Sequence, residues 1–233
     1  RFAVHMVTGE RITWDKTMHA YPSMAEISGQ GNTLGDALKF YGIVNDATLV
    51  AAEAEAAAAG LGLAEVLVRA GHATEEEIAT AWGEVSRLPV EAFDPLLTEE
   101  AARDAIPSEL ARKFSVFPVA SSRNSIKLAV AEPLSGEAEA ELAAALKPSL
   151  NFVIAPASDV GFGLRFGWDR TAIEPDLRAA RVLKRLALAD DEQIAAIWLG
   201  IRRVSAGAQP PFDFIRIARE SGILSDEDWK SLI

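Results

Sequence analysis

The stretch TLGDALKFYG at residues 33–42 recurs 29 residues later as GLAEVLVRAG at residues 62–71. Both copies carry leucine at their second and sixth positions and end on glycine, and the same spacing links Leu49 to Ile78 further along the chain. A pattern that returns at a fixed interval is typical of repeat architectures, in which each copy is one supersecondary unit. The sequence therefore predicts a tandem repeat over residues 33–88.

Each copy contains the signals of two helices joined by a tight turn. The first helix ends at Gly42 or Gly71, and glycine readily takes the left-handed conformation that follows a helix. Asn45 or Thr74 then provides an N-cap, and Thr74 with Glu77 makes a capping box. The second helices are expected over two ranges, residues 46–59 and 75–86. Each copy is thus predicted to be a helical hairpin.

The chain after residue 88 changes pattern and predicts a small α+β unit over residues 89–169. Runs rich in β-branched and aromatic residues indicate short strands, here residues 90–93, 115–120, 125–131 and 151–155. Helices are expected to begin near Thr98, Pro107, Gly136 and Ser158, with Thr98 and Ser158 as caps. The polar turn SSRN at residues 121–124 joins two strands as a hairpin, and we expect a sheet of about three strands.

The two ends of the chain complete the predicted organisation. Residues 1–32 are expected to be an extended lead-in that follows a membrane region, and residues 170–233 a helical tail. Within the tail, ESGILSDE at residues 220–227 is similar to RAGHATEE at residues 69–76, which indicates a partial third copy of the repeat. The fold class expected for the whole chain is α+β, predominantly helical.

Composition excludes several classes of protein. The formal net charge of −11 repels nucleic acids, so we expect no nucleic-acid partner. There is no cysteine, which removes disulfides and thiolate chemistry. No apolar run reaches the roughly 18 residues of a membrane helix. The three histidines are dispersed and no nucleophile or acid–base pair stands out, so we expect no catalytic residue, no metal site and no cofactor.

Carboxylates gather at residues 75–77 and 190–192, where helices are expected to begin. Acidic side chains are favourable at such positions because they face the positive end of the helix dipole. We interpret both clusters as solvated faces.

The two copies resemble the repeat of MshEN domains in secretion and pilus-assembly ATPases. That pattern is Arg-Leu-Gly, two residues, two aliphatics, two residues, Gly, and then spaced leucines closing on Gln. Downstream segments resemble the same family, among them LPV at residues 88–90, IPSELAR at residues 106–112 and AEPL at residues 131–134. The resemblance extends from residue 33 to about residue 166. It implies an MshEN fold and cyclic-di-GMP as a regulatory ligand, held by backbone groups, leucines and the motif's Arg and Gln.

The resemblance places the ligand site on matching positions of both copies. These positions, with one nearby arginine, are Thr33, Leu34, Gly35, Leu38, Gly42, Leu49, Leu63, Ala64, Leu67, Arg69, Gly71 and Ile78. The polar positions depart from the family pattern, because Thr33 and Gly62 stand where the motif has Arg, and Ala64 stands where it has its first Gly. The apolar skeleton is kept while charged groups are lost, so Arg69 is the nearest guanidinium that can replace them.

The same residues also have a structural interpretation. The repeated leucines fit the core of a helical hairpin, Gly42 and Gly71 fit helix ends, and Gly35 permits close approach of either a ligand or a neighbouring helix. Two hypotheses therefore stay open. One is a regulatory domain that binds cyclic-di-GMP, and the other is a degenerate MshEN-like module that docks a protein partner and binds no nucleotide.

A short string near the start of the chain bears on the host of this domain. The chain has no phosphate loop of the type GxxxxGK[ST], so the ATPase core is absent from it. Trp14, Lys16, Thr17 and His19 resemble the W-x-K-T-x-H segment of family 2 glycosyltransferases of the phage-adsorption protein B type. This resemblance implies a module at the cytoplasmic face of the bacterial inner membrane, attached to a glycosyltransferase that makes an envelope polysaccharide. Its partners would be cyclic-di-GMP, the glycosyltransferase portion of the same polypeptide and an envelope secretion component.

Overall fold

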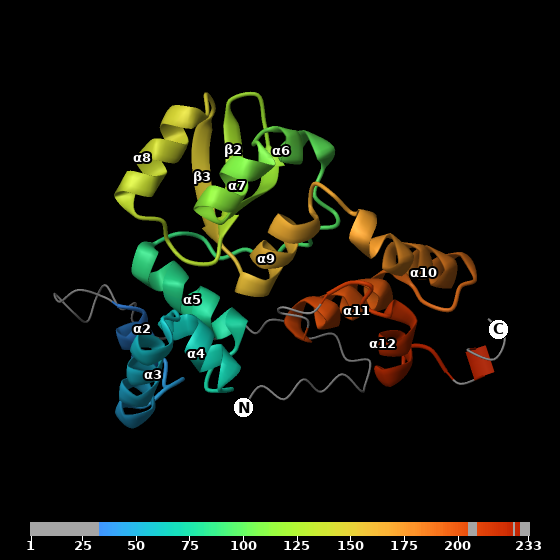
Figure 1. The fold of residues 1–233 in the computed structure, drawn as a ribbon, viewed down its shortest axis with the longest axis horizontal. Coiled ribbons are helices and arrows are strands. Elements are labelled where there is room, and N and C mark those ends of the chain that lie inside the picture. Colours follow the sequence, from blue (N-terminus) through green and yellow to red (C-terminus); the bar gives the residue numbers. More distant parts are fainter. Residues whose placement is uncertain (1–32, 205–208, 226, 229–233) are drawn as a thin grey trace, which may run out of the picture.

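The computed structural model describes residues 33–204, 209–225 and 227–228, so the predicted lead-in over residues 1–32 lies outside the described residues. The described residues form three units that follow one another along the chain (Figure 1). A set of short helices comes first, a three-stranded sheet with its helices second, and a further set of helices third. The architecture is α+β and predominantly helical, as predicted.

The first unit is a pair of helical hairpins. α2 (Leu34–Phe40) and α3 (Asp46–Ala59) form one hairpin, and α4 (Leu63–Arg69) and α5 (Glu75–Ser86) form the other. α2 packs on α5 and α3 packs on α4, so the two hairpins are interleaved. A shared core of leucine, valine and alanine side chains lies between them. The second helix of each hairpin has the bounds that its sequence predicts.

Caps decide where these helices begin. Thr33 and Thr74 each form a capping box with the acidic residue three positions further on, and Asn45 caps α3 through its side chain. The N-cap of α4 is Gly62, which provides no side-chain hydrogen bond. The start of the second copy is therefore the one place in the repeat where no side chain holds the first turn.

One backbone turn recurs at four places in the described residues. At Gly42, Gly71, Ala187 and Gly222 the backbone takes a positive φ between 56° and 72°. Each of these four residues donates its own N–H to a carbonyl three residues back, over 2.9 to 3.0 Å, and the next residue donates to a carbonyl five residues back, over 2.8 to 3.0 Å, as in a Schellman motif. The donor and acceptor pairs of the second bond are Ile43 with Leu38, His72 with Leu67, Leu188 with Leu183, and Ile223 with Ala218. At Gly60, which also has a positive φ, only the second of these bonds is formed. The stretch ESGILSDE contains one of these turns, and the turn at Ala187 was not apparent from the sequence.

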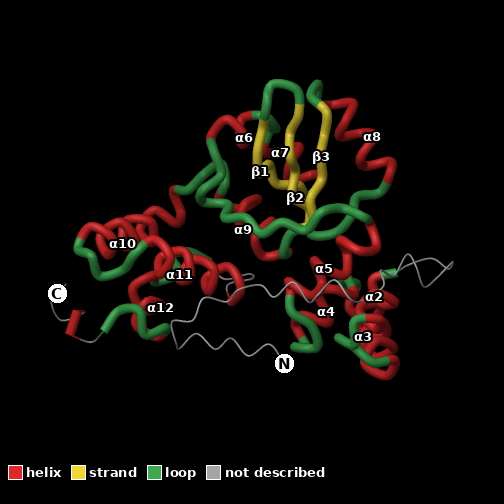
Figure 2. Tube along the Cα trace, turned by 180° about the vertical axis from the view of Figure 1, so that it is seen from behind, coloured by secondary structure: helices red, strands yellow, loops and turns green. Residues whose placement is uncertain are grey.

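The second unit contains a small mixed sheet. Its strands are β1 (Val116–Ser121), β2 (Ser125–Val130) and β3 (Ser149–Ile154), with β1 antiparallel to β2 and β2 parallel to β3. Its helices are α6 (Glu100–Asp104), α7 (Ser108–Phe114), α8 (Gly136–Ala145) and α9 (Ala157–Phe166). Figure 2 shows the sheet from the side opposite to α7 and α8. α9 follows β3 and lies between the sheet and the other two units (Figure 1).

The prediction of a strand over residues 90–93 is wrong. Val90 makes a single bridge to Ile154, which is the last residue of β3. The chain then leaves the sheet, and the ring of Phe93 stacks on that of Phe117 with centroids 5.6 Å apart. Packing of this aromatic pair takes the place of further strand pairing.

Two predicted caps are also wrong. α6 begins after Glu99 rather than after Thr98, and α9 begins after Pro156 rather than after Ser158. Proline fixes its own φ near the value that a helix start requires. The N–H of Ser158 is bound from outside its helix by the carboxylate of Glu75, at 2.8 Å.

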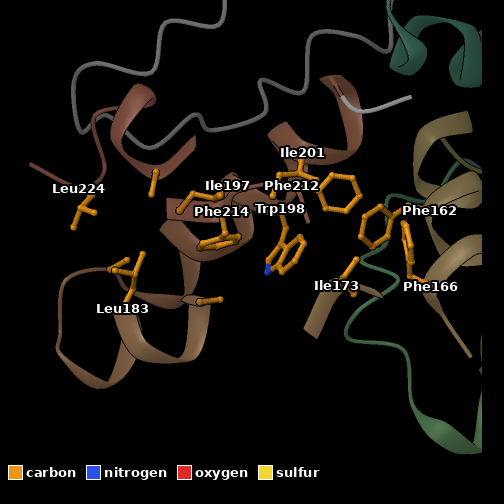
Figure 3. Close-up of a cluster of buried hydrophobic side chains, with 13 residues drawn as sticks. Phe162, Phe166, Ile173, Leu183, Ile197, Trp198, Ile201, Phe212, Phe214 and Leu224 are labelled. Atoms are coloured by element: carbon orange, nitrogen blue, oxygen red, sulfur yellow. The ribbon is translucent and has the colours of Figure 1, made fainter. Parts of the chain in front are cut away.

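The third unit is helical and has an aromatic core. Its elements are a 3-10 helix (Thr171–Ile173), α10 (Glu174–Arg185), α11 (Asp191–Val204) and α12 (Phe214–Glu220). Trp198, Phe212 and Phe214 pack together at its centre (Figure 3). Phe162 and Phe166 of α9 complete this core, so α9 ties the third unit to the second.

None of the described helices is by itself long and apolar enough to cross a membrane. α3 and α4 meet the length and composition requirement only as a pair, and the chain bends by 111° between them.

Candidate ligand-binding site

Two cavities lie against the repeat and share part of their walls. The larger has a volume of about 770 Å³ and the smaller about 290 Å³. Four residues line both, namely Gly62, Ala64, Trp82 and Glu132. The start of α4 therefore stands between two adjoining spaces.

The smaller cavity brings together the beginnings of the two repeat copies. Residues 33–35, at the start of α2, line it together with residues 62–64, at the start of α4. Trp82, Glu53 and Glu132 complete its lining. Because these include two carboxylates and neither lysine nor arginine, this space is formally negative.

The larger cavity lies where the three units meet. α4 and α5 line it from the first unit, α9 from the second and the end of α11 from the third. Its charged lining residues are four arginines and three glutamates: Arg69, Arg165, Arg202, Arg203, Glu65, Glu75 and Glu132. Positive charge is thus available in the larger cavity and lacking in the smaller one.

Trp82 carries a buried polar atom without a partner. Its Nε1 is enclosed, yet it has no hydrogen bond among the described residues. Most buried N–H groups are paired, and leaving one unpaired costs about 1 to 3 kcal/mol. Trp82 therefore lines both cavities while its own indole N–H stays buried and unpaired among the described residues.

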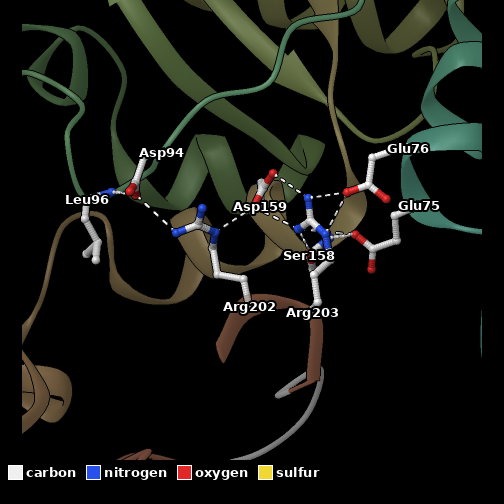
Figure 4. Close-up of polar contacts among 8 residues, drawn as sticks. All are labelled: Glu75, Glu76, Asp94, Leu96, Ser158, Asp159, Arg202 and Arg203. Carbon is white, nitrogen blue, oxygen red and sulfur yellow. Dashed lines mark hydrogen bonds and ion pairs between the residues drawn. The ribbon is translucent and has the colours of Figure 1, made fainter. Parts of the chain in front are cut away.

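Two adjacent arginines of α11 reach the larger cavity, and the first of them is an anchor (Figure 4). The side chain of Arg202 is 5% exposed, and its Nε donates to Asp159 Oδ1 at 2.7 Å. Its Nη1 donates to Asp94 Oδ1 at 3.3 Å. The side chain of Asp159 is only 3% exposed, and charges buried to this degree are held in pairs because their desolvation is costly. Arg202 thus fixes α11 to α9 and to the segment before α6.

Arg203 links α11 to both of the other units (Figure 4). Its Nη1 and Nη2 donate to the two carboxylate oxygens of Asp159 at 3.0 and 3.1 Å, and Nη1 also donates to Ser158 Oγ. Toward α5, its Nε donates to Glu76 Oε1 at 3.0 Å, and Nη1 lies 3.8 Å from Glu75 Oε2. Burial tends to lower the pKa of Arg203, but Asp159 and Glu76 outweigh burial and raise this pKa, so the guanidinium stays charged.

The interpretation of residues 75–77 as a solvated face is wrong for Glu75, whose side chain is only 13% exposed, whereas Glu76 is 58% exposed and still has a distant partner. Glu75 accepts the N–H of Ser158, and Glu76 accepts from Arg203. Glu77 alone acts at its own helix start, through the capping box. The partners of Glu75 and Glu76 lie 83 and 127 residues away along the chain, so no local pattern points to them.

The structure places only some of the predicted ligand-binding residues at the cavities. The smaller cavity is lined by Thr33, Leu34, Gly35, Leu63 and Ala64, and the larger one by Ala64, Arg69 and Ile78. The remaining five line neither cavity: Leu38, Leu49 and Leu67 are core residues of the repeat, and Gly42 and Gly71 are turn residues.

Two of the predicted residues that do line a cavity, Gly35 and Arg69, also contact other side chains of the repeat. A Cβ at Gly35 would lie 2.9 Å from Leu49 Cδ2, so a larger residue there would displace the end of that buried leucine side chain. Arg69 pairs with Glu55 at 2.6 Å, and both side chains are about half exposed. Arg69 is therefore at the larger cavity but already has an acidic partner.

The cavity residues that were not predicted from the sequence include an aromatic residue and three arginines, namely Trp82, Arg165, Arg202 and Arg203. A basic pair at the end of an amphipathic helix was visible at residues 202–203, but nothing in the sequence shows that this helix end meets the repeat. Trp82 falls on the buried face of α5, where it looks like an ordinary core residue.

Residues 86–161 match the family model described as the MshEN domain. This match confirms the predicted MshEN resemblance for the second unit, because it runs from the last residue of α5 into α9. It leaves out the two hairpins that carry the predicted ligand residues.

None of the curated proteins compared with the chain matches it. Among solved structures, one of MshE with cdg is similar, with 26% sequence identity and a TM-score of 0.49 over 57% of this chain and 96% of that chain. The N-terminal domain of XpsE has 23% identity and a TM-score of 0.44 over 57% of this chain and 91% of that chain.

Proposed function

We propose that this chain, with its MshEN segment, is a regulatory module that binds cyclic-di-GMP in the two adjoining cavities. One observation carries the proposal. The two copies of the motif begin at residues 33–35 and 62–64, and both beginnings line one cavity that shares a wall with a second, arginine-bearing cavity. The positions that the family resemblance assigns to the ligand thus line the smaller cavity, and the guanidinium groups suited to a phosphate line the adjoining larger cavity.

The size and lining of the cavities support a ligand of this kind. Small-molecule sites usually have volumes of about 300 to 1,000 Å³, and the larger cavity has about 770 Å³. Guanine bases need an apolar or aromatic wall, which Trp82 supplies in both cavities.

Charge decides how the ligand lies. Phosphates favour guanidinium groups, because these make charge-assisted and often bidentate hydrogen bonds. The smaller cavity offers only Glu53 and Glu132 as charged groups, whereas the larger offers Arg165 and Arg203. We therefore assign the phosphates to the larger cavity and a base to the smaller one.

The alternative of a protein-docking module without nucleotide also has a specific observation in its favour. Arg69, Arg202 and Arg203 are all paired with carboxylates, so a phosphate has to compete for them. In addition, neither motif arginine is present, since Thr33 and Gly62 occupy those positions. The docking-module alternative expects a nucleotide site whose arginines have been lost or are engaged by carboxylates.

The proposal extends to the host of the module. The resemblance of residues 14–19 to certain glycosyltransferases, which lies outside the described residues, supports attachment to a membrane glycosyltransferase that makes an envelope polysaccharide. The module would then lie at the cytoplasmic face of the inner membrane, with an envelope secretion component as a further partner. It would need no cofactor and catalyse nothing itself. Control requires that the ligand bind one state of the host more tightly than the other.

Calorimetric titration of the 233-residue chain with cyclic-di-GMP tests the proposal, with Ala64→Glu as the site variant. Ala64 is in the first turn of α4 and lines both cavities. A carboxylate in a first turn is favourable for the helix, but it repels a phosphate in the adjoining space. Ala47→Glu is the matched control, because Ala47 is exposed in the first turn of α3 and lines neither cavity.

We expect the wild type to bind cyclic-di-GMP and Ala47→Glu to bind it with the same affinity. The affinity of Ala64→Glu should be lower by about tenfold or more, and a tenfold loss corresponds to about 1.4 kcal/mol of repulsion. GTP at equal concentration controls for non-specific anion binding. Absence of heat and of any rise in melting temperature at about 100 μM cyclic-di-GMP would reject nucleotide binding and favour the docking module.

A further inference from the structure

Arg203 belongs to the third unit, yet it lines the larger cavity together with the repeat. It comes from the last turn of α11, and the cavity wall around it is built by α4, α5 and α9. The MshEN match ends at residue 161, so Arg203 lies outside the matched segment. The third unit thus contributes a cation to a site that the family resemblance places entirely in the repeat.

The two edges of this guanidinium are held with different strength. Asp159 binds Nη1 and Nη2 and is 3% exposed, so this pair is shielded from water. Glu76 binds Nε and Nη2, and its side chain is 58% exposed. Exposed ion pairs are weak because water and salt screen them. The bond to Asp159 is therefore the fixed one, and the bond to Glu76 is the replaceable one.

A ligand phosphate in the cavity would offer Arg203 a better partner than Glu76. The Nε–Nη2 edge that Glu76 occupies presents two parallel donors, which suits a phosphate as well as a carboxylate. Arg202 does not compete for this role, because Asp159 and Asp94 hold it in a buried position.

We propose that Arg203 recognises a phosphate of the ligand by exchanging Glu76 for it, which couples occupancy of the cavity to the contact between α5 and α11. This inference rests on the proposed function and names how the same site is regulated. Binding and the α5–α11 contact oppose each other, and by linkage each weakens the other by the same factor. The third unit is then the part of the chain that senses the ligand.

The exchange makes a prediction with opposite signs for the two partners of one ion pair. Arg203→Ala removes a phosphate-binding group, so the affinity for cyclic-di-GMP should fall about tenfold or more. Glu76→Gln removes a competitor, so the affinity should rise about threefold. A purely structural ion pair predicts the same direction for both, since either change breaks the contact equally.

A double-mutant cycle separates exchange from a general charge effect. If Glu76 acts by competing for Arg203, the gain from Glu76→Gln disappears in the Arg203→Ala background. If the gain came only from removing a negative charge near the ligand, it would persist there. Matched controls are Arg178→Ala, an exposed arginine of α10, and Glu137→Gln, an exposed glutamate of α8; neither residue lines the cavity.

Titration calorimetry with cyclic-di-GMP on the full chain supplies all of these affinities, and circular dichroism melting checks that each variant is folded. Hydrogen exchange adds an independent readout, because amide exchange in α11 should rise with ligand in the wild type and not in Arg203→Ala. Wild-type binding with an unchanged Arg203→Ala affinity overturns this inference and leaves the proposed function intact. Absence of wild-type binding overturns both. Should Arg203→Ala fail to fold, Glu76→Gln alone decides, and unchanged or lower affinity in that variant overturns the exchange.

Discussion

Restoring the missing motif arginine at Gly62 is the sharpest perturbation that the fold allows. Gly62 is the N-cap of α4, with φ −73° and ψ 147°, a conformation open to any residue. A Cβ added there would meet no atom within 4 Å, and the residue lines both cavities. Thr33, the other motif position, is less suitable because its replacement removes a capping box, at a cost of about 1 kcal/mol.

The size of the gain follows from the exposure of the site. A hydrogen bond to a charged group contributes about 1.5 to 3 kcal/mol in a buried setting. Gly62 is exposed, so solvent screening reduces this to about 1 to 2 kcal/mol. Since 1.4 kcal/mol is a factor of ten, Gly62→Arg should bind cyclic-di-GMP about five- to thirtyfold more tightly than the wild type.

Calorimetry on Gly62→Arg and on a matched variant measures this gain. Gly136→Arg is the control, because Gly136 is also at a helix start, has the same open space of 4 Å around an added Cβ, and lines neither cavity. The gain should shrink as salt is added, since it is electrostatic. Equal affinities of the two variants, with both melting like the wild type, would refute the assignment of the motif starts to the ligand.

Two further predictions concern stability, measured by urea unfolding. Ala187→Gly should raise the free energy of unfolding by about 0.5 to 1 kcal/mol, because Ala187 has a φ of 56° that glycine adopts without steric strain. A loss of stability in this variant would contradict the left-handed turn at residue 187. Leu67→Ala should destabilise by about 2 to 5 kcal/mol, because Leu67 is fully buried in the core. Leu63→Ala should cost clearly less, because Leu63 is part-buried in a cavity wall, and equal losses would show that Leu63 is a core residue instead.

The repeat was predictable because its signals are local. A left-handed glycine, an N-cap and an apolar residue at a fixed distance all act within about ten residues, so Gly71 and Thr74 suffice to define the second turn. The strand expected at residues 90–93 failed for the opposite reason. Its pairing depends on how far β3 extends beside it, and only Val90 finds a partner there.

The candidate site was only partly predictable because it is assembled from distant segments. The motif positions brought Thr33 and Ala64 to the cavities. Three of the four arginines come from α9 and α11, and the hydrogen bond between Arg203 and Glu76 spans 127 residues. The helix dipole alone is enough to explain glutamates at the start of α5. The sequence therefore gave no reason to expect that these glutamates have partners elsewhere in the chain.

The recurring turn also explains how this chain tolerates change at its surface. Each of the four turns is specified by one residue of positive φ and by backbone hydrogen bonds to a fully buried residue, such as Leu38 or Leu183. None of these requirements involves the polar positions beside the turn. The choice of residue at position 62, where Gly62 stands in place of the motif arginine, is therefore nearly neutral for folding, since a Cβ added there meets no atom within 4 Å. The scaffold is robust to mutation where the ligand chemistry is fragile, so affinity can be tuned, lost or regained without rebuilding the fold.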